Sequence, residues 1–278
     1  MSSKSRKNRE RKEKELTLQD WFKIIDDCKD MGVFVFNASG GEPFMRKDWY
    51  EILYYARKNG IDIGITSNGT LIDENIVKKL KKLDIFNIHL SLDGIGEVHD
   101  YFRNKKGVFE KVINSINLLK KYKIPFGITT AISKRNLQNI DEIKDFIKKN
   151  KINSWEIYYA IPIGCMKRKD ALDREEIVEL ATKFSEYKKE LNETKIFVGD
   201  NLGYHDKYNL QENWKGCQAG LSICAIDSEG NVKGCPIHPN ELIEGNVKNK
   251  GFSEIWRDKN SFIYNRRPQE LDEHCKKC

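Results

Sequence analysis

Long apolar stretches are missing from this chain of 278 residues. No run approaches the roughly 18 apolar residues that a membrane-spanning helix needs, so we expect no membrane partner. Residues 1–15 also lack the apolar core of a secretory signal peptide. Together the two absences predict a cytoplasmic protein.

A concentrated charged surface is also missing, although the chain carries a net charge of +7. The excess is spread over several helical faces, such as residues 78–82 and 148–151, which favours solubility over a specific partner. Residues 1–15 do form a basic arm, with seven Lys or Arg against three Glu. Such a run is typical of a solvated tail, and we expect no nucleic-acid partner.

Without a signal peptide, the 7 cysteines are not expected to form disulfides, because a reducing compartment keeps thiols free. Cys28 and Cys165 stand alone, the first on the apolar face of a predicted helix and the second after a predicted strand. The remaining cysteines crowd into the last quarter of the chain: Cys217, Cys224, Cys235, Cys275 and Cys278. This crowding predicts metal ligation.

Helical and strand-like segments alternate from Thr17 onward, which indicates βα units around a parallel sheet. The predicted strands cover residues 33–39, 62–67, 86–92, 126–131 and 154–159. The predicted helices cover residues 17–31, 49–58, 75–83, 108–122, 139–150 and 174–191. We therefore predict a basic arm over residues 1–16, an α/β domain over 17–200 and a small cysteine-rich domain over 201–278.

Small and polar residues follow the predicted strands, at the sheet edge where parallel α/β folds bind ligands. The first strand runs into Gly40, Gly41 and Glu42, where paired glycines let a ligand approach the backbone and the carboxylate can face an amino group. Each motif alone could be an ordinary turn. The residues at or after the ends of the next strands are Ser67, Asn68, Ser91, Asp93 and Arg103.

Taken together, these motifs resemble the radical SAM superfamily over nearly the whole chain. The resemblance implies a partial (β/α)6 barrel, here lacking its first strand, that binds S-adenosyl-L-methionine (SAM). It places Gly40, Gly41 and Glu42 at the methionyl amino group, and Arg103 at the methionyl carboxylate. By the same resemblance, the ribose would meet Ser91 and Asp93, while Ser67 and Asn68 would line the pocket, with Ser133 a further candidate.

The chain departs from this family in one respect: it contains no C-x3-C-x2-C loop. In the family these cysteines hold the catalytic [4Fe–4S] cluster. Because Met1 falls where the loop should end and Cys278 ends the chain abruptly, we expect truncation at both ends. The catalytic residues, and whether this chain is itself an enzyme, stay open.

The C-terminal pattern Cys217-x12-Gly230-x4-Cys235, followed by Cys275-x2-Cys278, resembles the SPASM/Twitch domains that bind auxiliary iron–sulfur clusters. In a Twitch-like arrangement, these cysteines complete one site and Cys224 is a bystander or an alternative ligand. In a fuller SPASM arrangement, Cys217, Cys224 and Cys235 serve one cluster, while Cys275 and Cys278 begin a second. A zinc site is the alternative, since zinc shares the ligands and the spacing.

The resemblance implies an enzyme that forms a 5′-deoxyadenosyl radical and removes hydrogen from a substrate. We expect a peptide substrate first, with a tetrapyrrole or another small molecule as the alternative. An electron donor such as a ferredoxin or flavodoxin would be needed. Two further readings are a noncatalytic module that binds SAM and an iron–sulfur cluster, and a zinc-stabilised binding domain.

Overall fold

The computed structural model describes residues 14–163, 166–199, 208, 210 and 216–267. The predicted ligands Cys275 and Cys278, Cys165, and most of the basic arm lie outside these residues. Two compact units make up the chain. The first combines Met1–Phe34 with Cys217–Cys278, and the second is Val35–Gly216. The predicted boundaries at residues 16 and 200 stay predictions.

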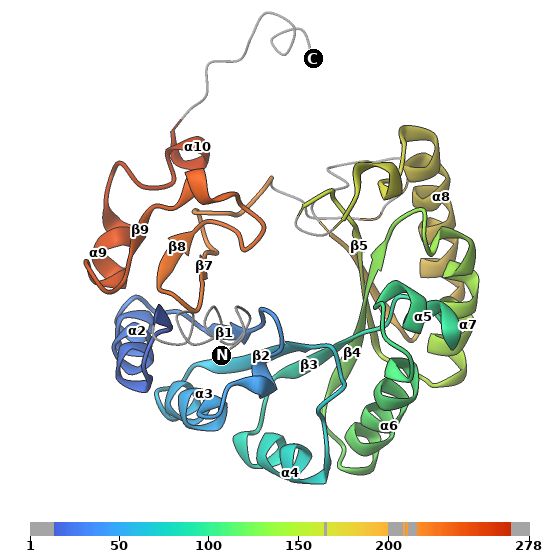
Figure 1. Cartoon of the computed structure of the whole chain (residues 1–278), viewed down its shortest axis with the longest axis horizontal. Helices are drawn as coiled ribbons and strands as arrows, with labels where there is room; N and C mark the ends of the chain where they lie inside the picture. Colours follow the sequence, from blue (N-terminus) through green and yellow to red (C-terminus); the bar gives the residue numbers. More distant parts are fainter. Residues whose placement is uncertain (1–13, 164–165, 200–207, 209, 211–215, 268–278) are drawn as a thin grey trace, which may run out of the picture. The chain divides into compact units, whose positions relative to one another are not determined.

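A parallel sheet organises the second unit, with strand order β1-β2-β3-β4-β5-β6 (Figure 1). Its strands are β1 (Val35–Ala38), β2 (Asp62–Ser67), β3 (Asn87–Ser91), β4 (Phe126–Ile132), β5 (Ser154–Tyr159) and β6 (Lys195–Val198). Because sequential strands are spatial neighbours, their carboxyl ends follow one another along a single edge. This confirms the predicted α/β fold of the partial-barrel type.

Helices cover one face of this sheet, as the outer ring of Figure 1 shows for α3, α4, α6, α7 and α8. The helices are α3 (Trp49–Lys58), α4 (Glu74–Leu83), α5 (Glu97–Phe102), α6 (Val108–Lys121), α7 (Ile140–Lys149) and α8 (Arg174–Glu190), with 3₁₀ turns at Pro43–Met45, Leu137–Asn139 and Arg168–Asp170. Trp155 of β5 marks the helix-covered face, because its ring stacks on Tyr187 of α8 at a centroid distance of 6.1 Å.

The sheet has one strand more than the predicted five, because β6 was not expected. This strand is short and carries the charged Lys195 at its start, so its alternating pattern is too brief to recognise. Its buried positions, Ile196 and Val198, alternate with exposed ones, as in a strand at a sheet edge. Helix α5 was also not expected.

The first helix whose bounds lie within the described residues of the first unit is α2 (Leu18–Asp30), which Thr17 caps. The Thr17 hydroxyl accepts a hydrogen bond from the Asp20 N–H, and the Asp20 carboxylate accepts one from the Thr17 N–H. The later elements of the unit are the antiparallel strands β7 (Ala225–Ile226), β8 (Asn231–Lys233) and β9 (Gly245–Asn246), a 3₁₀ turn at Asn240–Leu242, α9 (Phe252–Arg257) and α10 (Ile263–Arg266).

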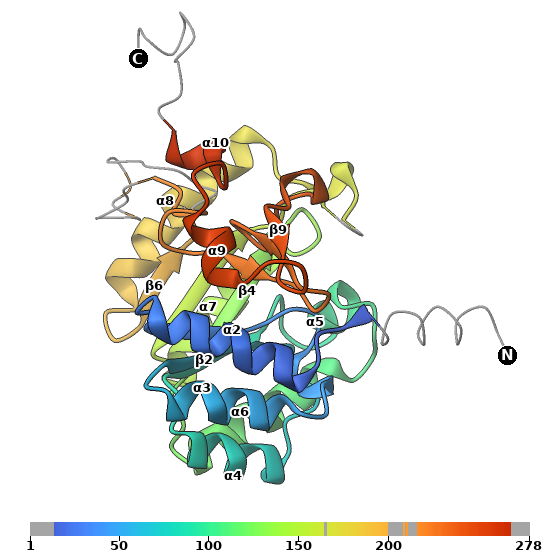
Figure 2. The same ribbon diagram turned by 90° about the vertical axis from the view of Figure 1, so that its left-hand side faces the viewer.

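Segments far apart in sequence hold the first unit together. The carboxylate of Asp27 in α2 accepts hydrogen bonds from the backbone N–H and the hydroxyl of Ser253 at the start of α9, each at 3.0 Å. Figure 2 shows these two helices side by side. The N–H of Leu16 donates to the carbonyl of Ser228 at 2.7 Å. None of the helices in the described part of the chain is long and apolar enough to cross a bilayer.

Candidate functional site

The end of β1 opens into free space at two glycines. Gly40 has a φ of +107°, a conformation that side chains other than glycine rarely adopt. A Cβ atom at Gly40 or Gly41 would meet no atom within 4 Å. The backbone at this strand end is therefore open to a ligand on the side where other residues would project a side chain.

Glu42, which follows these glycines, is held against the end of β2. Its carboxylate accepts hydrogen bonds from the Ser67 hydroxyl at 2.9 Å and from the Asn68 N–H at 2.8 Å. Asn68 itself is held in a turn after β2, because its side chain accepts a hydrogen bond from the Thr70 N–H at 2.8 Å. The structure thus brings together three of the predicted residues: Glu42, Ser67 and Asn68.

Burial raises the pKa of Glu42, and the hydrogen bonds from Asn68 and Ser67 oppose that shift. A carboxylate in such a position gains most from a cation, because a nearby positive charge lowers the cost of burying the negative one. The buried Glu42 carboxylate therefore fits a positively charged amino group.

Asp93, directly after β3, is fully buried and joins several elements. Its Oδ1 accepts a hydrogen bond from the Ala131 N–H of β4 at 2.9 Å, and its Oδ2 lies 2.6 Å from the Arg103 guanidinium. Its carbonyl oxygen accepts a hydrogen bond from the Asn136 side chain at 2.9 Å. Both carboxylate oxygens therefore already face partners in the protein, which makes Asp93 a support for Arg103.

Arg103 follows α5 and keeps a third of its side chain exposed, at 33%. Complete burial raises the pKa of Asp93, and the charge of Arg103 acts against that shift. The guanidinium has donor groups beyond the one that faces Asp93, and they can bind a carboxylate. The pair accordingly presents a positive group near the sheet's carboxyl edge.

His99 of α5 completes this arrangement, and the sequence had not indicated it. Its Nδ1 accepts a hydrogen bond from the Asp93 N–H at 3.1 Å, which assigns the ring proton to Nε2. Burial lowers the pKa of His99 to about 4, with the neighbouring Arg103 charge adding to the effect. The ring is therefore neutral at pH 7.

Ser91 and Ser133 lie at the ends of β3 and β4. Ser91 is half-buried, and Ser133 is buried with its N–H donating to the Asn136 side chain at 2.8 Å. Asn136 thus joins the loop after β4 to the carbonyl of Asp93. Asn136 lies in a short turn of mixed polarity, so the sequence gives no signal that it links these two segments.

The described cysteines of the first unit separate into two groups. Burial is the largest cause of the raised pKa of Tyr264, followed by the charge of Glu244, and Cys217 and Cys235 both add to the shift. Burial raises the pKa of Cys224 to about 11 and that of Cys28 to about 12, and Cys224 contributes to the shift at Cys28. Among the described residues, no three Cys, His, Asp or Glu side chains gather as a metal site.

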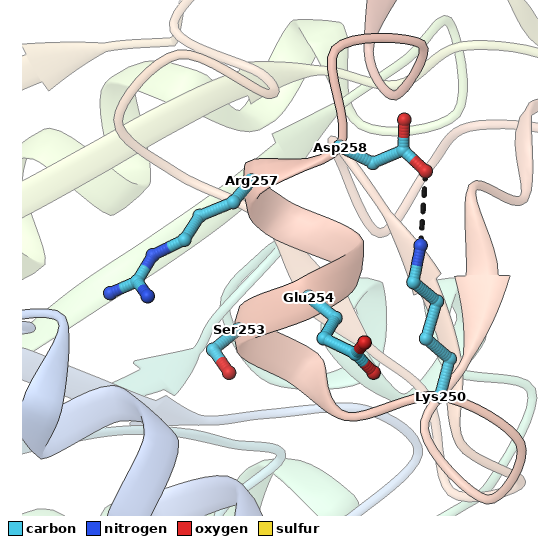
Figure 3. A pocket seen from close by; sticks show the side chains of 5 residues that line it. All are labelled: Lys250, Ser253, Glu254, Arg257 and Asp258. Atoms are coloured by element: carbon cyan, nitrogen blue, oxygen red, sulfur yellow. Dashed lines mark hydrogen bonds and ion pairs between the residues drawn. The ribbon is translucent and has the colours of Figure 1, made fainter.

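Two surface pockets are lined by residues other than these predicted site residues. One, of about 320 Å³, is lined by side chains on and beside α9 (Figure 3). The figure shows Lys250 facing Asp258, with their ion pair at 3.0 Å. A second, of about 230 Å³, lies between the ends of α7 and α8 and the residues before β5 and β6. Neither contains a residue that the strand-end motifs indicate.

Comparison with known proteins gives matches to both parts of the chain. Residues 2–147 match the Radical SAM superfamily, and residues 217–278 match SPASM, an iron–sulfur cluster-binding domain. The AdoMet-dependent heme synthase of Methanosarcina barkeri is 29% identical, over 95% of this chain and 80% of the relative. The Fe-coproporphyrin III synthase of the same organism is 31% identical, over 88% of this chain and 67% of the relative.

Among solved structures, Streptococcus suis SuiB bound to S-adenosylmethionine has a TM-score of 0.76 and 22% sequence identity. The match covers 95% of this chain and 64% of SuiB, so the chain spans less than two thirds of that protein. At this identity the likeness shows a shared fold. SuiB has also been solved bound to its precursor peptide SuiA.

Proteins of the two matched families bind [4Fe–4S] clusters and SAM. The open glycines and the buried Glu42 fit the amino group of SAM, and Cys217 and Cys235 fit thiolate ligands of a cluster. The first match covers more than half of the sequence. The chain therefore belongs to the radical SAM superfamily and carries an iron–sulfur cluster-binding domain of the SPASM family at its C-terminus.

Proposed function

We propose that this protein is a radical SAM enzyme that removes a hydrogen atom from a peptide substrate. A reduced [4Fe–4S] cluster and SAM would together supply a 5′-deoxyadenosyl radical for this reaction, and the 278 residues contain no C-x3-C-x2-C motif that would hold this cluster. The observation that carries the proposal is the contact of Glu42 with Ser67 and Asn68. These hydrogen bonds hold the Glu42 carboxylate between the ends of β1 and β2, beside the open backbone of the two glycines.

The residues at the strand ends would orient SAM by its charges. Glu42 would accept hydrogen bonds from the methionyl amino group, while Gly40 and Gly41 leave room for it. Arg103, held by Asp93, would pair with the methionyl carboxylate. A zwitterion held at both charges has little rotational freedom, which is how a binding site fixes the orientation of a reacting bond.

Ser91 would face the ribose, since it lies at the end of β3 and is half-buried. Asp93 was expected beside it from the resemblance, but its engaged oxygens favour a supporting role. For the cluster of the C-terminal domain we propose the ligands Cys217, Cys235, Cys275 and Cys278, the last two of which lie outside the described residues.

A binding and product measurement tests the proposal. Native protein, isolated and reduced under anaerobic conditions, should bind SAM and release 5′-deoxyadenosine, detected by chromatography and mass spectrometry. Glu42→Gln should bind SAM about tenfold more weakly, the loss expected for one charge-assisted hydrogen bond. Glu190→Gln is the matched control, because Glu190 is an exposed carboxylate that pairs with Lys144 and Lys148.

Each result has a distinct meaning. SAM binding without 5′-deoxyadenosine would make the protein a noncatalytic module. Absence of SAM binding, or equal affinity in Glu42→Gln and Glu190→Gln, would contradict the proposed site. Zinc in place of iron in the isolated protein would leave the C-terminal domain with a structural metal.

A further inference from the structure

The two faces of β5 differ in chemistry. Trp155 and Ile157 are fully buried on the face that the helices cover. Strand geometry turns Glu156 and Tyr158 to the opposite face. The Glu156 side chain is 30% exposed, and Tyr158 is 43% exposed. The face away from the helices therefore carries a carboxylate within reach of solvent.

Glu156 is held in place by side chains from two neighbouring strands. Nδ1 of His89 on β3 lies 2.9 Å from Oε2 of Glu156, and the Thr129 hydroxyl on β4 donates to the same oxygen at 3.2 Å. Gly127 makes room for this imidazole, because a Cβ there would lie only 2.7 Å from its Nε2. These contacts all reach one oxygen of the carboxylate.

The second oxygen, Oε1, makes no hydrogen bond or ion pair with any residue in the described ranges. Exposed aromatic residues occupy neighbouring positions on the same face. Phe197 of β6 stands opposite Glu156 in the strand register and is 53% exposed. Tyr158 follows two positions along β5 on the same face. Together we call His89, Thr129, Glu156, Tyr158 and Phe197 the Glu156 patch.

Other charged groups of this face are placed elsewhere. Lys195 lies opposite Ser154, one pleat toward the amino ends of the strands, and the described residues show no ion pair between it and Glu156. Asp62, at the start of β2, pairs with Arg57 at 3.0 Å. Arg103 stands beyond the carboxyl end of β3 and pairs with Asp93. The patch therefore presents acceptors and aromatic rings.

We propose that the Glu156 patch binds a cationic nitrogen of a peptide, the ammonium of a lysine or the guanidinium of an arginine. A carboxylate held at one oxygen and open at the other accepts such a cation, and aromatic rings beside it attract the same charge. The carboxylates of a tetrapyrrole would be repelled by Glu156. The identity of this peptide as the substrate rests on the proposed function, whereas the binding itself does not.

Calorimetry on the full chain tests the patch with short glycine-rich peptides that are blocked at both ends. One carries a central lysine, one a norleucine, which has similar length without the charge, and one a glutamate. We expect the lysine peptide to bind at least about tenfold more tightly than the others at low salt. Glu156→Gln should abolish that preference, and the control Glu190→Gln should retain it.

Equal binding of the lysine and norleucine peptides to the native chain would overturn the proposal, as would failure of all three to bind. Retention of the preference in Glu156→Gln would also overturn it. Phe197→Leu keeps an apolar side chain at an exposed site. It should weaken binding of the lysine peptide by a smaller factor than Glu156→Gln does. If SAM does not bind while the lysine preference persists, the proposed function fails and the cation site stands.

Discussion

The strand-end site of the second unit and the cysteine region of the first unit are assembled in different ways. In the second unit, buried polar groups satisfy one another: Glu42 accepts from Ser67 and Asn68, and Asp93 joins Ala131, Asn136 and Arg103. In the described part of the first unit, Cys217, Cys224 and Cys235 lie in loops beside very short strands, and none of these three thiols makes a hydrogen bond. Polar pairing prepares the first site, whereas a metal would complete the second.

The largest effect expected from this difference concerns the cysteines. Cys217→Ala and Cys235→Ala should each lose most of the C-terminal iron, because removing a thiolate opens the cluster. Cys224→Ala should keep its iron, because the charge of Cys224 acts on Cys28, whereas those of Cys217 and Cys235 act on Tyr264. The measurement is the content of iron and acid-labile sulfide per protein in each variant, determined anaerobically. Loss of iron in Cys224→Ala would instead support the fuller SPASM arrangement.

Removing the carboxylate of Asp93 should produce the largest loss of stability in the second unit. Asp93→Ala strands the Ala131 N–H and the Arg103 charge, at a cost of about 3 kcal/mol in the free energy of unfolding. Urea denaturation measures this change. Asp145→Ala, at an exposed carboxylate that pairs with Lys144, should cost roughly 0.5 kcal/mol or less. Similar costs in both variants would contradict the supporting role of Asp93.

The neutral His99 predicts a pH dependence confined to the second unit. Its folded pKa of about 4 lies below the ordinary 6.5, so the unfolded chain takes up a proton first as the pH falls. The stabilisation is complete above pH 6.5 and is lost toward pH 4, by up to roughly 3 kcal/mol.

The measurement is the difference in unfolding free energy between the native chain and His99→Asn across this pH range. Glu42 and Asp93 have raised pKa values, so their contributions are lost as the pH rises. Glu42 is present in both proteins, so its contribution cancels in the difference, which then reports His99 together with the Asp93 group that it contacts. A flat difference would show that the ring carries a proton or is solvated in the folded state.

The smallest expected effects compare the capping boxes of α2 and α8. Thr17→Ala in the first unit and Asp173→Ala in the second should each cost about 1 kcal/mol, because each removes a side-chain acceptor at a helix start. Hydrogen exchange read by mass spectrometry should show faster exchange in α2 for the first variant and in α8 for the second. Faster exchange in both helices for either variant would mean that the units open together.

Strand and helix positions were largely predictable from sequence. β2 and β5 have the predicted bounds. Each is a short run rich in β-branched or aromatic residues, and a small or polar residue marks where the run ends. β6 was missed because a strand of 4 residues with a charged start has no clear period. That Glu42 and Ser67 lie close together follows from the parallel topology alone, since the ends of adjacent parallel strands meet at one edge of the sheet.

The support of Arg103 could not be predicted in the same way. It depends on a backbone N–H of Ala131 and on side chains of His99 and Asn136, which lie in short elements without a periodic pattern. The Glu156 patch was missed for a similar reason. Its members come from separate strands, and only the pairing register brings Glu156 opposite Thr129 and Phe197.

Trp155 links β5, β4 and the end of β3 through side-chain hydrogen bonds. Its indole N–H donates to the Thr130 hydroxyl at 2.9 Å, and that hydroxyl donates to the carbonyl of Leu92 at 2.8 Å. This chain of side-chain bonds crosses from β5 through β4 to the residue before Asp93. Under a force along the strands it resists shear, so sliding of β3 against β4 would break it and displace the support of Arg103 in the same movement.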